Sequence, residues 1–213
     1  MIGPAATVFV IDDDESVRKS LRRLLDAAHY ETEAFKSASE FLSRSAYPGS
    51  SCVIVDVKMP GLNGIDLQQA LIDRGREEQL LFITAHGDIP MCAQAMKAGA
   101  VDFLPKPFKP KQLLESVERA LSRSAEERLR ATERNHARGL IERLTPREYE
   151  VMQLVATGML NKQVGGELGM AEKTVKTHRA HVMQKLNITS VAELMVVLQK
   201  AEVTPPAKPG TKV

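Results

Sequence analysis

The chain has 213 residues, 43% of them hydrophobic, so it can bury at least one core and has room for two domains. It contains no apolar run near the roughly 20 residues that span a bilayer and begins with no basic and then apolar leader, so we expect neither membrane insertion nor secretion. The two cysteines, Cys52 and Cys92, lack metal-binding or redox spacing, and reduced thiols are typical of a cytoplasmic protein.

The net charge of +2 is unevenly distributed along the chain. Residues 1–124 carry 15 Lys and Arg against 17 Asp and Glu, a net charge of −2, whereas residues 140–213 carry 10 against 7, a net charge of +3. This order favours a regulatory module followed by a module that binds nucleic acid.

The first half of the chain alternates strand-like and helix-like patterns. Near-continuous apolar runs over residues 7–11, 52–55 and 80–83 are typical of buried parallel strands, and two further strands are predicted near 30–35 and 101–104. Amphipathic patterns predict helices over 15–27, 64–74, 89–98 and 109–121. Such alternation predicts a parallel sheet with helices on both faces.

Acidic and other polar residues follow several of these predicted strands. Asp12 and Asp13 follow the first, Asp56 and Thr84 follow two others, and Lys106 comes after the last. Because the carboxyl ends of parallel strands share one edge of a sheet, we expect these residues to converge there. A single Asp would be better interpreted as a loop or cap residue, but the whole set favours a divalent cation site suited to phosphate chemistry.

A charged stretch separates this half from a purely helical one. Residues 122–139 have almost no apolar stripe, so they are interpreted as the interdomain linker, either extending the last helix or forming a hinge. Beyond it, capping boxes are predicted at Thr145 to Glu148 and at Ser190 to Glu193. Gly169 lies in a short turn between two predicted helices, which is helix-turn-helix spacing, and Gly158 is placed to end another helix.

Several motifs carry a resemblance to known families. IDDD at 11–14, VDVKMPG at 55–61 with Gly64, TAHGD at 84–88 and GAVDFLPKPF at 99–108 resemble the receiver domain of two-component response regulators. LTPRE at 144–148, NKQ at 161–163 and KTVKTHR at 173–179 resemble the LuxR-type DNA-binding domain. The combination resembles the FixJ branch of the FixJ/NarL family of transcription regulators.

The resemblance implies an architecture. The receiver would be an α/β domain over residues 1–122, with a five-stranded, doubly wound parallel sheet of the CheY/flavodoxin-like kind. A helical linker would cover 123–139, and an all-α, four-helix LuxR-type helix-turn-helix domain would cover 140–202. The tail, 203–213, rich in Pro, Lys and Gly, is predicted to be disordered.

The resemblance also implies a phosphorylation site. Asp56 would accept a phosphoryl group from a sensor histidine kinase, with Thr84 and Lys106 completing the reactive set. The implied Mg²⁺ ligands are Asp12, Asp13, Asp56 and the backbone carbonyl of Lys58. Pro107 would follow a cis peptide bond.

Phosphorylation is expected to change the receiver surface. The added charge would draw in the Thr84 hydroxyl, and the space it leaves could admit the ring of Phe103, although Phe103 could equally be a permanent core residue. Residues 89–103 are the predicted face of a homodimer that forms on phosphorylation.

The resemblance places a recognition helix over residues 172–186 in the major groove of double-stranded DNA. Base contacts are expected from Lys176, Thr177 and Ala180, and phosphate contacts from Lys162, Thr174 and Arg179. His178 and His181 have the spacing of a metal pair, but no third ligand is in view.

Two departures from the family pattern predict reduced stability of the helix-turn-helix domain. Ala171 replaces the usual Ser or Thr cap of the recognition helix, at a cost of about 1 kcal/mol. Gly165 and Gly166 lie inside the preceding helix, each at a cost of up to about 1 kcal/mol relative to Ala.

The sequence therefore predicts a response regulator, not an enzyme, that controls transcription, with RNA polymerase as a further candidate partner. Other interpretations remain open. An Asp-nucleophile phosphatase would need a second acid where Lys58 stands. A module with an RNA-binding or protein-binding output, or a regulator that binds DNA without phosphorylation, would also fit parts of the pattern.

Overall fold

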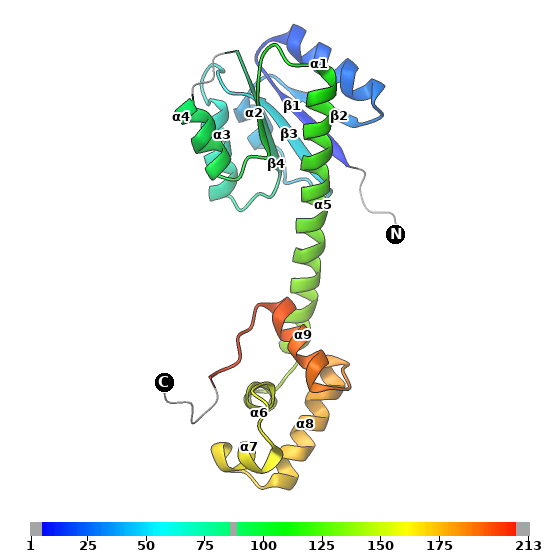
Figure 1. Ribbon diagram of the computed structural model, residues 1–213, viewed down its shortest axis with the longest axis vertical. Helices are drawn as coiled ribbons and strands as arrows, with labels where there is room; N and C mark the ends of the chain where they lie inside the picture. The colour runs from blue at the N-terminus through cyan, green and yellow to red at the C-terminus, as the bar shows by residue number, and fades with distance from the viewer. Residues whose placement is uncertain (1–5, 86–88, 208–213) are drawn as a thin grey trace. The chain divides into compact units, whose positions relative to one another are not determined.

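The computed structural model describes residues 6–85 and 89–207, which fall into two compact units, Met1–Arg128 and Leu129–Val213 (Figure 1). His86, Gly87 and Asp88 of the receiver-like motif, and residues 208–213 of the tail, lie outside the described residues. Within the described residues no helix is long and apolar enough to cross a membrane.

Five strands among the described residues form one parallel sheet in the first unit. They are β1 (Thr7–Ile11), β2 (Glu31–Phe35), β3 (Ser51–Asp56), β4 (Gln79–Thr84) and β5 (Asp102–Pro105), in the order β2-β1-β3-β4-β5. Every residue of β1, β3 and β4 is buried, as their continuous apolar runs predict, whereas β2 at the edge is largely exposed. The predicted parallel sheet is confirmed.

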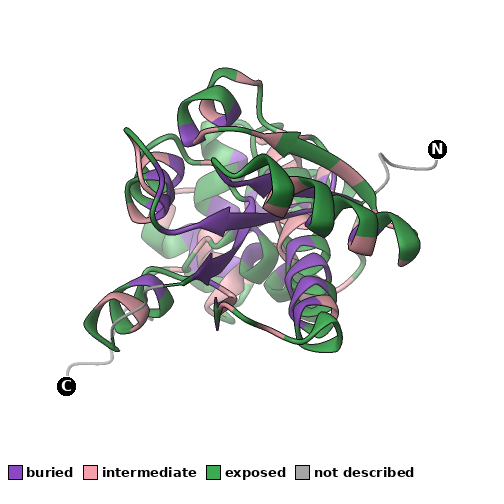
Figure 2. Cartoon of the chain, turned by 90° about the horizontal axis from the view of Figure 1, so that it is seen from above, coloured by how far each residue is buried: buried purple, intermediate pink, exposed green. Residues whose placement is uncertain are grey.

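Helices cover both faces of this sheet. On one face α2 (Ala38–Ser43), α3 (Gly64–Asp73) and α4 (Ile89–Lys97) pack against Phe9, Val53, Val55 and Phe82. On the other, α1 (Glu15–Ala27) and the first part of α5 (Pro110–Ile141) pack against Val8, Val10, Ile54 and Leu81. Figure 2 shows the buried strands between helices whose outer sides are exposed. The short helix α2 was not predicted from the apolar pattern.

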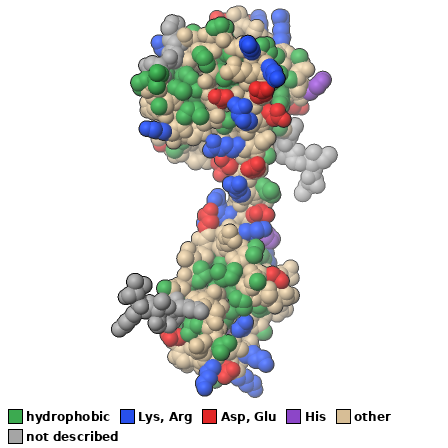
Figure 3. All heavy atoms as spheres, in the orientation of Figure 1, with side chains coloured by type: hydrophobic (Ala, Val, Ile, Leu, Met, Phe, Trp, Pro, Cys, Tyr) green, Lys and Arg blue, Asp and Glu red, His purple; other side chains and the backbone are tan. Residues whose placement is uncertain are grey.

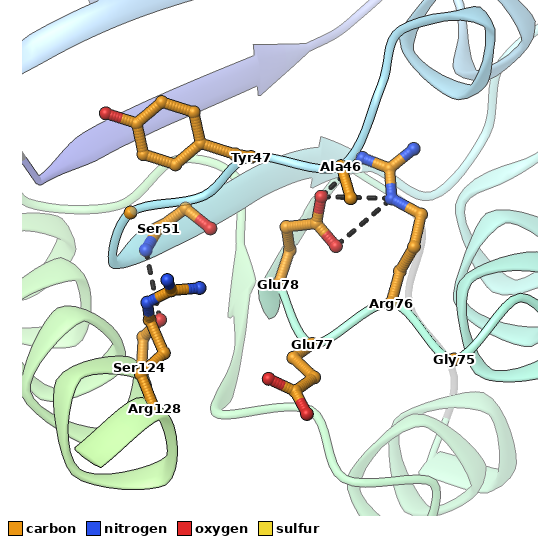
Figure 4. Close-up of a pocket in the computed structure, with 10 residues that line it drawn as sticks. Ala46, Tyr47, Ser51, Gly75, Arg76, Glu77, Glu78, Ser124 and Arg128 are labelled. Atoms are coloured by element: carbon orange, nitrogen blue, oxygen red, sulfur yellow. Dashed lines mark hydrogen bonds and ion pairs between the residues drawn. The ribbon is translucent and has the colours of Figure 1, made fainter. Parts of the chain in front are cut away.

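Helix α5 continues without a break through the stretch that the sequence suggests as a linker. Its residue Ser124 is 3% exposed, and its hydroxyl oxygen accepts a hydrogen bond of 3.0 Å from the Ser51 amide at the start of β3 (Figure 4). Beside this contact lies a cavity of about 130 Å³, bordered by the ion pair of Arg76 and Glu78. Part of the proposed linker therefore packs on the sheet, and the limits 1–122, 123–139 and 140–202 stay a prediction.

Helices are the only regular secondary structure among the described residues of the second unit. The end of α5 packs with α6 (Pro146–Ala156), α7 (Asn161–Leu168), α8 (Glu172–Leu186) and α9 (Val191–Ala201) around Met152, Val164, Val182 and Leu198. These four helices after α5 confirm the expected all-α helix-turn-helix architecture.

The helix ends in this unit follow their capping residues. Thr145 and Glu148 form the predicted capping box, and Gly169 ends α7 in the left-handed conformation at φ 65°. Gly158, at φ 85°, follows the end of α6. Ser190 caps the Glu193 amide, while the Glu193 carboxylate accepts a hydrogen bond from the amide of Thr189, one residue before the N-cap, so the second predicted box is only half formed.

Candidate functional site

The register of the sheet brings the strand-end residues to one edge. Ile11 pairs with Val55, and Asp56 pairs with Ile83, so Asp12 and Asp56 leave neighbouring strands at the same level. Thr84 pairs with Pro105, and its carbonyl oxygen accepts a 2.7 Å hydrogen bond from the Lys106 amide. The following Lys106–Pro107 peptide is cis, as expected.

Lys106 joins the two buried carboxylates. Its ammonium nitrogen lies 2.7 Å from Oδ1 of Asp56 and 2.9 Å from Oδ2 of Asp12. Asp12 is 1% exposed and Asp56 7% exposed, so these charge-assisted hydrogen bonds are largely shielded from water. The remaining oxygens accept backbone hydrogen bonds, Asp56 Oδ2 from the Lys58 amide at 2.7 Å and Asp12 Oδ1 from the Asp14 amide at 2.9 Å.

Burial and charge shift the titration of two members of this cluster. Burial raises the pKa of Asp12, although the hydrogen bond from Lys106 opposes that rise. Burial lowers the pKa of Lys106, but its contacts with Asp56 and Asp12 outweigh burial and leave that pKa above its ordinary value. The Lys106 ammonium is therefore held in its charged form.

The donor set fits a hard divalent cation. Asp12 and Asp56 place two negative charges against the single positive charge of Lys106, and Asp13, exposed, follows Asp12 directly. Carboxylate and carbonyl oxygens are the ligands that Mg²⁺ takes in proteins. Across residues 6–85 and 89–207, no three His, Cys, Asp or Glu side chains are gathered as a metal cluster. The histidine pair at 178 and 181 likewise gains no third ligand there.

Two further residues, Thr84 and Phe103, lie on neighbouring strands. Thr84 is 1% exposed at the end of β4. Phe103 pairs with Phe82 in the β4–β5 register, and their ring centroids lie 6.0 Å apart. Phe103 is only partly buried and packs at the margin of the core that α3 and α4 cover.

Gly64 and Gln68 hold α3 in place beside this edge of the sheet, and neither residue was assigned this role from the sequence. A Cβ on Gly64 would lie 2.6 Å from the Asp56 carbonyl oxygen, so only glycine lets α3 begin this close to β3. The buried Gln68 side chain donates a 3.0 Å hydrogen bond to the Ala95 carbonyl and so ties α3 to α4. Gly64 was part of a recognised motif, whereas Gln68 had no sequence signal beyond its place on the buried face of α3.

In the second unit, most of the predicted DNA-contacting residues lie on the surface. Lys162 on α7 is exposed, as are four residues of α8, namely Thr174, Lys176, Thr177 and Ala180. Figure 3 shows Lys and Arg side chains gathered at the end of this unit where α7 and the start of α8 lie in Figure 1. Arg179 differs from these residues because it is only partly exposed and donates to the Asn161 side chain at 3.1 Å.

Helix α8 is also fastened to α6 through a buried carboxylate. Glu148, 4% exposed, accepts a 2.6 Å hydrogen bond from the Lys185 ammonium and a 2.8 Å hydrogen bond from the Thr145 amide. Burial raises the pKa of Glu148, but these two contacts outweigh burial and lower that pKa to about 2. His181 Nδ1 lies 3.6 Å from the same carboxylate.

Comparison with known protein families agrees with both halves of this geometry. Residues 8–118 match the response regulator receiver domain, and residues 142–198 match the luxR family of bacterial regulatory proteins. The chain belongs to the two-component response regulators with a LuxR-type DNA-binding domain. This response regulator is thus a transcription regulator and not an enzyme, as predicted from its sequence. A receiver domain implies a sensor kinase, and a LuxR-type domain implies DNA.

Individual relatives extend over nearly the whole response regulator. It is 47% identical to nodulation protein W of Bradyrhizobium diazoefficiens over 190 residues, covering 89% of this chain and 84% of that protein. It is 37% identical to the transcriptional regulatory protein FixJ of Azorhizobium caulinodans, covering 93% and 94%.

Solved structures give the same result. The response regulator StyR is similar with a TM-score of 0.82 and 47% identity, covering 92% of this chain and all of that one. Full-length FixJ from B. japonicum is similar with a TM-score of 0.55 and 34% identity, covering 92% and 97%.

Proposed function

We propose that Asp56 accepts a phosphoryl group from a sensor histidine kinase, and that this modification promotes dimerisation and sequence-specific DNA binding. The observation that carries the proposal is the Lys106 ammonium between Asp56 and Asp12 at the carboxyl edge of the sheet. Asp56 is the last residue of the central strand β3, whereas Asp12 follows the end of β1, and Asp56 has a fixed cation on one oxygen and a backbone amide on the other.

In the proposed reaction, an Asp56 carboxylate oxygen attacks the phosphorus of a phosphohistidine. The phosphorus–nitrogen bond breaks, and the leaving imidazole takes up a proton. Lys106 moves its hydrogen bond to a phosphoryl oxygen, and the Thr84 hydroxyl donates to another. Mg²⁺, held by Asp12, Asp13, Asp56 and the Lys58 carbonyl, would neutralise charge on the phosphoryl oxygens.

The proposed switch uses the partly buried ring of Phe103. When Thr84 turns toward the phosphoryl group, the ring would move inward beside Phe82 and change the surface formed by α4 and β5. The intermediate burial of Phe103 supports this switch. A ring that is only partly buried at the edge of the core can become more deeply buried. This surface is the proposed homodimer face.

In the proposed DNA complex, α8 enters the major groove. Lys176, Thr177 and Ala180 would face bases, while Lys162 and Thr174 would contact phosphates. Their exposure supports this assignment. RNA polymerase as a partner and a cytoplasmic location remain predictions.

Labelling with a small phosphodonor and Mg²⁺ tests the phosphorylation site. Asp56→Asn should abolish labelling, whereas Asp73→Asn, which changes an exposed acid at the end of α3, should label like the parent. Full labelling of the Asp56 variant would remove the assignment.

Sedimentation tests the assembly step. The unmodified chain should be mainly monomeric and the phosphorylated chain dimeric, because paired half-sites on DNA require paired recognition helices. An unchanged mass after phosphorylation would contradict this step while leaving the labelling result intact.

A further inference from the structure

The recognition helix α8 has a polar connection to the start of α7. Nη1 of Arg179, in the middle of α8, donates a 3.1 Å hydrogen bond to Oδ1 of Asn161, the first residue of α7. Both residues are partly buried, whereas the neighbouring Lys162 and Ala180 are exposed. The Arg179 guanidinium is therefore directed along the α7–α8 contact, away from the fully exposed positions around it.

The start of α8 lacks a side-chain cap, although Val175 anchors it in the core and Lys185, nearer its end, donates to Glu148 on α6. Ala171 at the N-cap makes no side-chain hydrogen bond. The turn before it is held by backbone contacts, in which the Met170 amide donates to the Gly165 carbonyl at 2.9 Å. The hydrogen bond of Arg179, the eighth residue of α8, therefore has a larger share in orienting this helix than it would have on a helix with a side-chain cap.

We propose that Asn161 and Arg179 form a positioning pair that fixes α7 against α8, and that Arg179 is not one of the phosphate contacts. This inference rests on the proposed DNA-binding role of α8. Lys162 adjoins Asn161, so the pair sets the distance between the phosphate-contacting Lys162 and the base-facing residues Lys176 and Thr177. Loss of either partner therefore affects binding through geometry.

Arginine suits this role better than lysine. Its planar guanidinium holds several N–H donors in fixed directions, so one donor can bind the Asn161 amide oxygen in a defined geometry at this partly buried position. Lysine supplies a point charge on a flexible chain and would keep the charge near DNA without keeping the geometry. The substitution of Arg179 by Lys thus separates charge from position.

The test uses the full-length chain treated with the small phosphodonor and Mg²⁺, and a duplex that the parent selects from a random pool. Asn161→Ala and Arg179→Ala should each weaken binding about tenfold. The double variant should also weaken it only about tenfold, because the two substitutions remove the same hydrogen bond. Arg179→Lys should bind as weakly as Arg179→Ala. In these variants the slope of log affinity against log salt concentration should equal that of the parent, because no phosphate contact is lost.

Lys162→Ala is the matched control. Loss of a phosphate contact should lower the salt slope, which is the slope of log affinity against log salt concentration, by about one unit and leave base preference unchanged. The inference is overturned if Arg179→Ala behaves like this control, if Arg179→Lys restores binding, or if Asn161→Ala binds like the parent. Should the parent select no sequence, the proposed DNA-reading role of α8 fails instead.

A second measurement tests the pair independently of DNA. In urea unfolding of the helix-turn-helix domain within the full-length chain, the two single variants should lower the midpoint, and the double variant should lower it no further than the larger single effect. Strictly additive midpoint shifts would show that the two side chains act separately and would overturn the positioning pair.

Discussion

The Lys106 ammonium lies 2.7 Å from Oδ1 of Asp56, with the buried Asp12 carboxylate on its other side. One positive charge thus stands against two negative charges at a site that is largely closed to water. Removal of Lys106 would leave the two carboxylates without a cation between them, and such uncompensated burial is strongly unfavourable.

Lys106→Met should therefore lower the free energy of unfolding of the receiver domain by about 2 kcal/mol, less than for a fully buried pair because the lysine itself is partly exposed. Mg²⁺ should stabilise this variant more than the parent, since the cation takes over the lost charge compensation. Melting followed with Mg²⁺ and then with a chelator measures both effects. Lys109→Met, at an exposed position, is the control, and equal Mg²⁺ gains in variant and parent would contradict the interpretation.

Lys162 and Lys176 should have different effects on DNA binding. Lys162→Ala should weaken binding to all sequences similarly and lower the salt slope by about one unit. Lys176→Ala should remove roughly 1 to 3 kcal/mol of discrimination at one base position per half-site. Selection from random duplexes at several salt concentrations distinguishes them, and an unchanged preference for the Lys176 variant would show that α8 docks differently.

The two adjacent glycines of α7 should respond in opposite directions to alanine. A Cβ on Gly165 would lie 2.6 Å from the Met170 carbonyl oxygen, so Gly165→Ala must displace the turn and destabilise the domain. A Cβ on Gly166 would meet nothing within 4 Å, so Gly166→Ala should stabilise the domain by about 0.5 to 1 kcal/mol through helix propensity. Each variant is the other's control in urea unfolding, and equal shifts of the same sign would refute the structural distinction.

Acid should weaken the helix-turn-helix domain through Glu148. The contacts with Lys185 and Thr145 lower its pKa to about 2, while in the unfolded chain it returns toward its ordinary value of 4.5. The unfolded state therefore binds more protons between these values, so the stabilisation is complete above about pH 4.5 and is lost as the pH falls toward about 2. Urea unfolding across this range should show the loss.

Glu148→Gln should lose part of that pH dependence and be less stable at neutral pH, because Lys185 loses its charged partner. Glu150→Gln, a change at an exposed acid on the same helix, should keep the dependence of the parent. Identical pH profiles for the Glu148 variant and the parent would exclude Glu148 as the source.

Much of the fold and site followed from local features of the sequence. Apolar runs of strand length, strand-end acids and capping residues act over a few positions, so the parallel sheet, the convergence of Asp12, Asp56 and Lys106, and the Thr145 cap could be predicted. Tertiary structure decided what depends on residues far apart in the chain. Arg179 meets Asn161 across 18 positions and Lys185 meets Glu148 across 37, so neither pair leaves a periodic signal. The difference between Gly165 and Gly166 likewise appears only when the approach of Met170 is known, because a close backbone contact is a property of packing in space and not of composition along the helix.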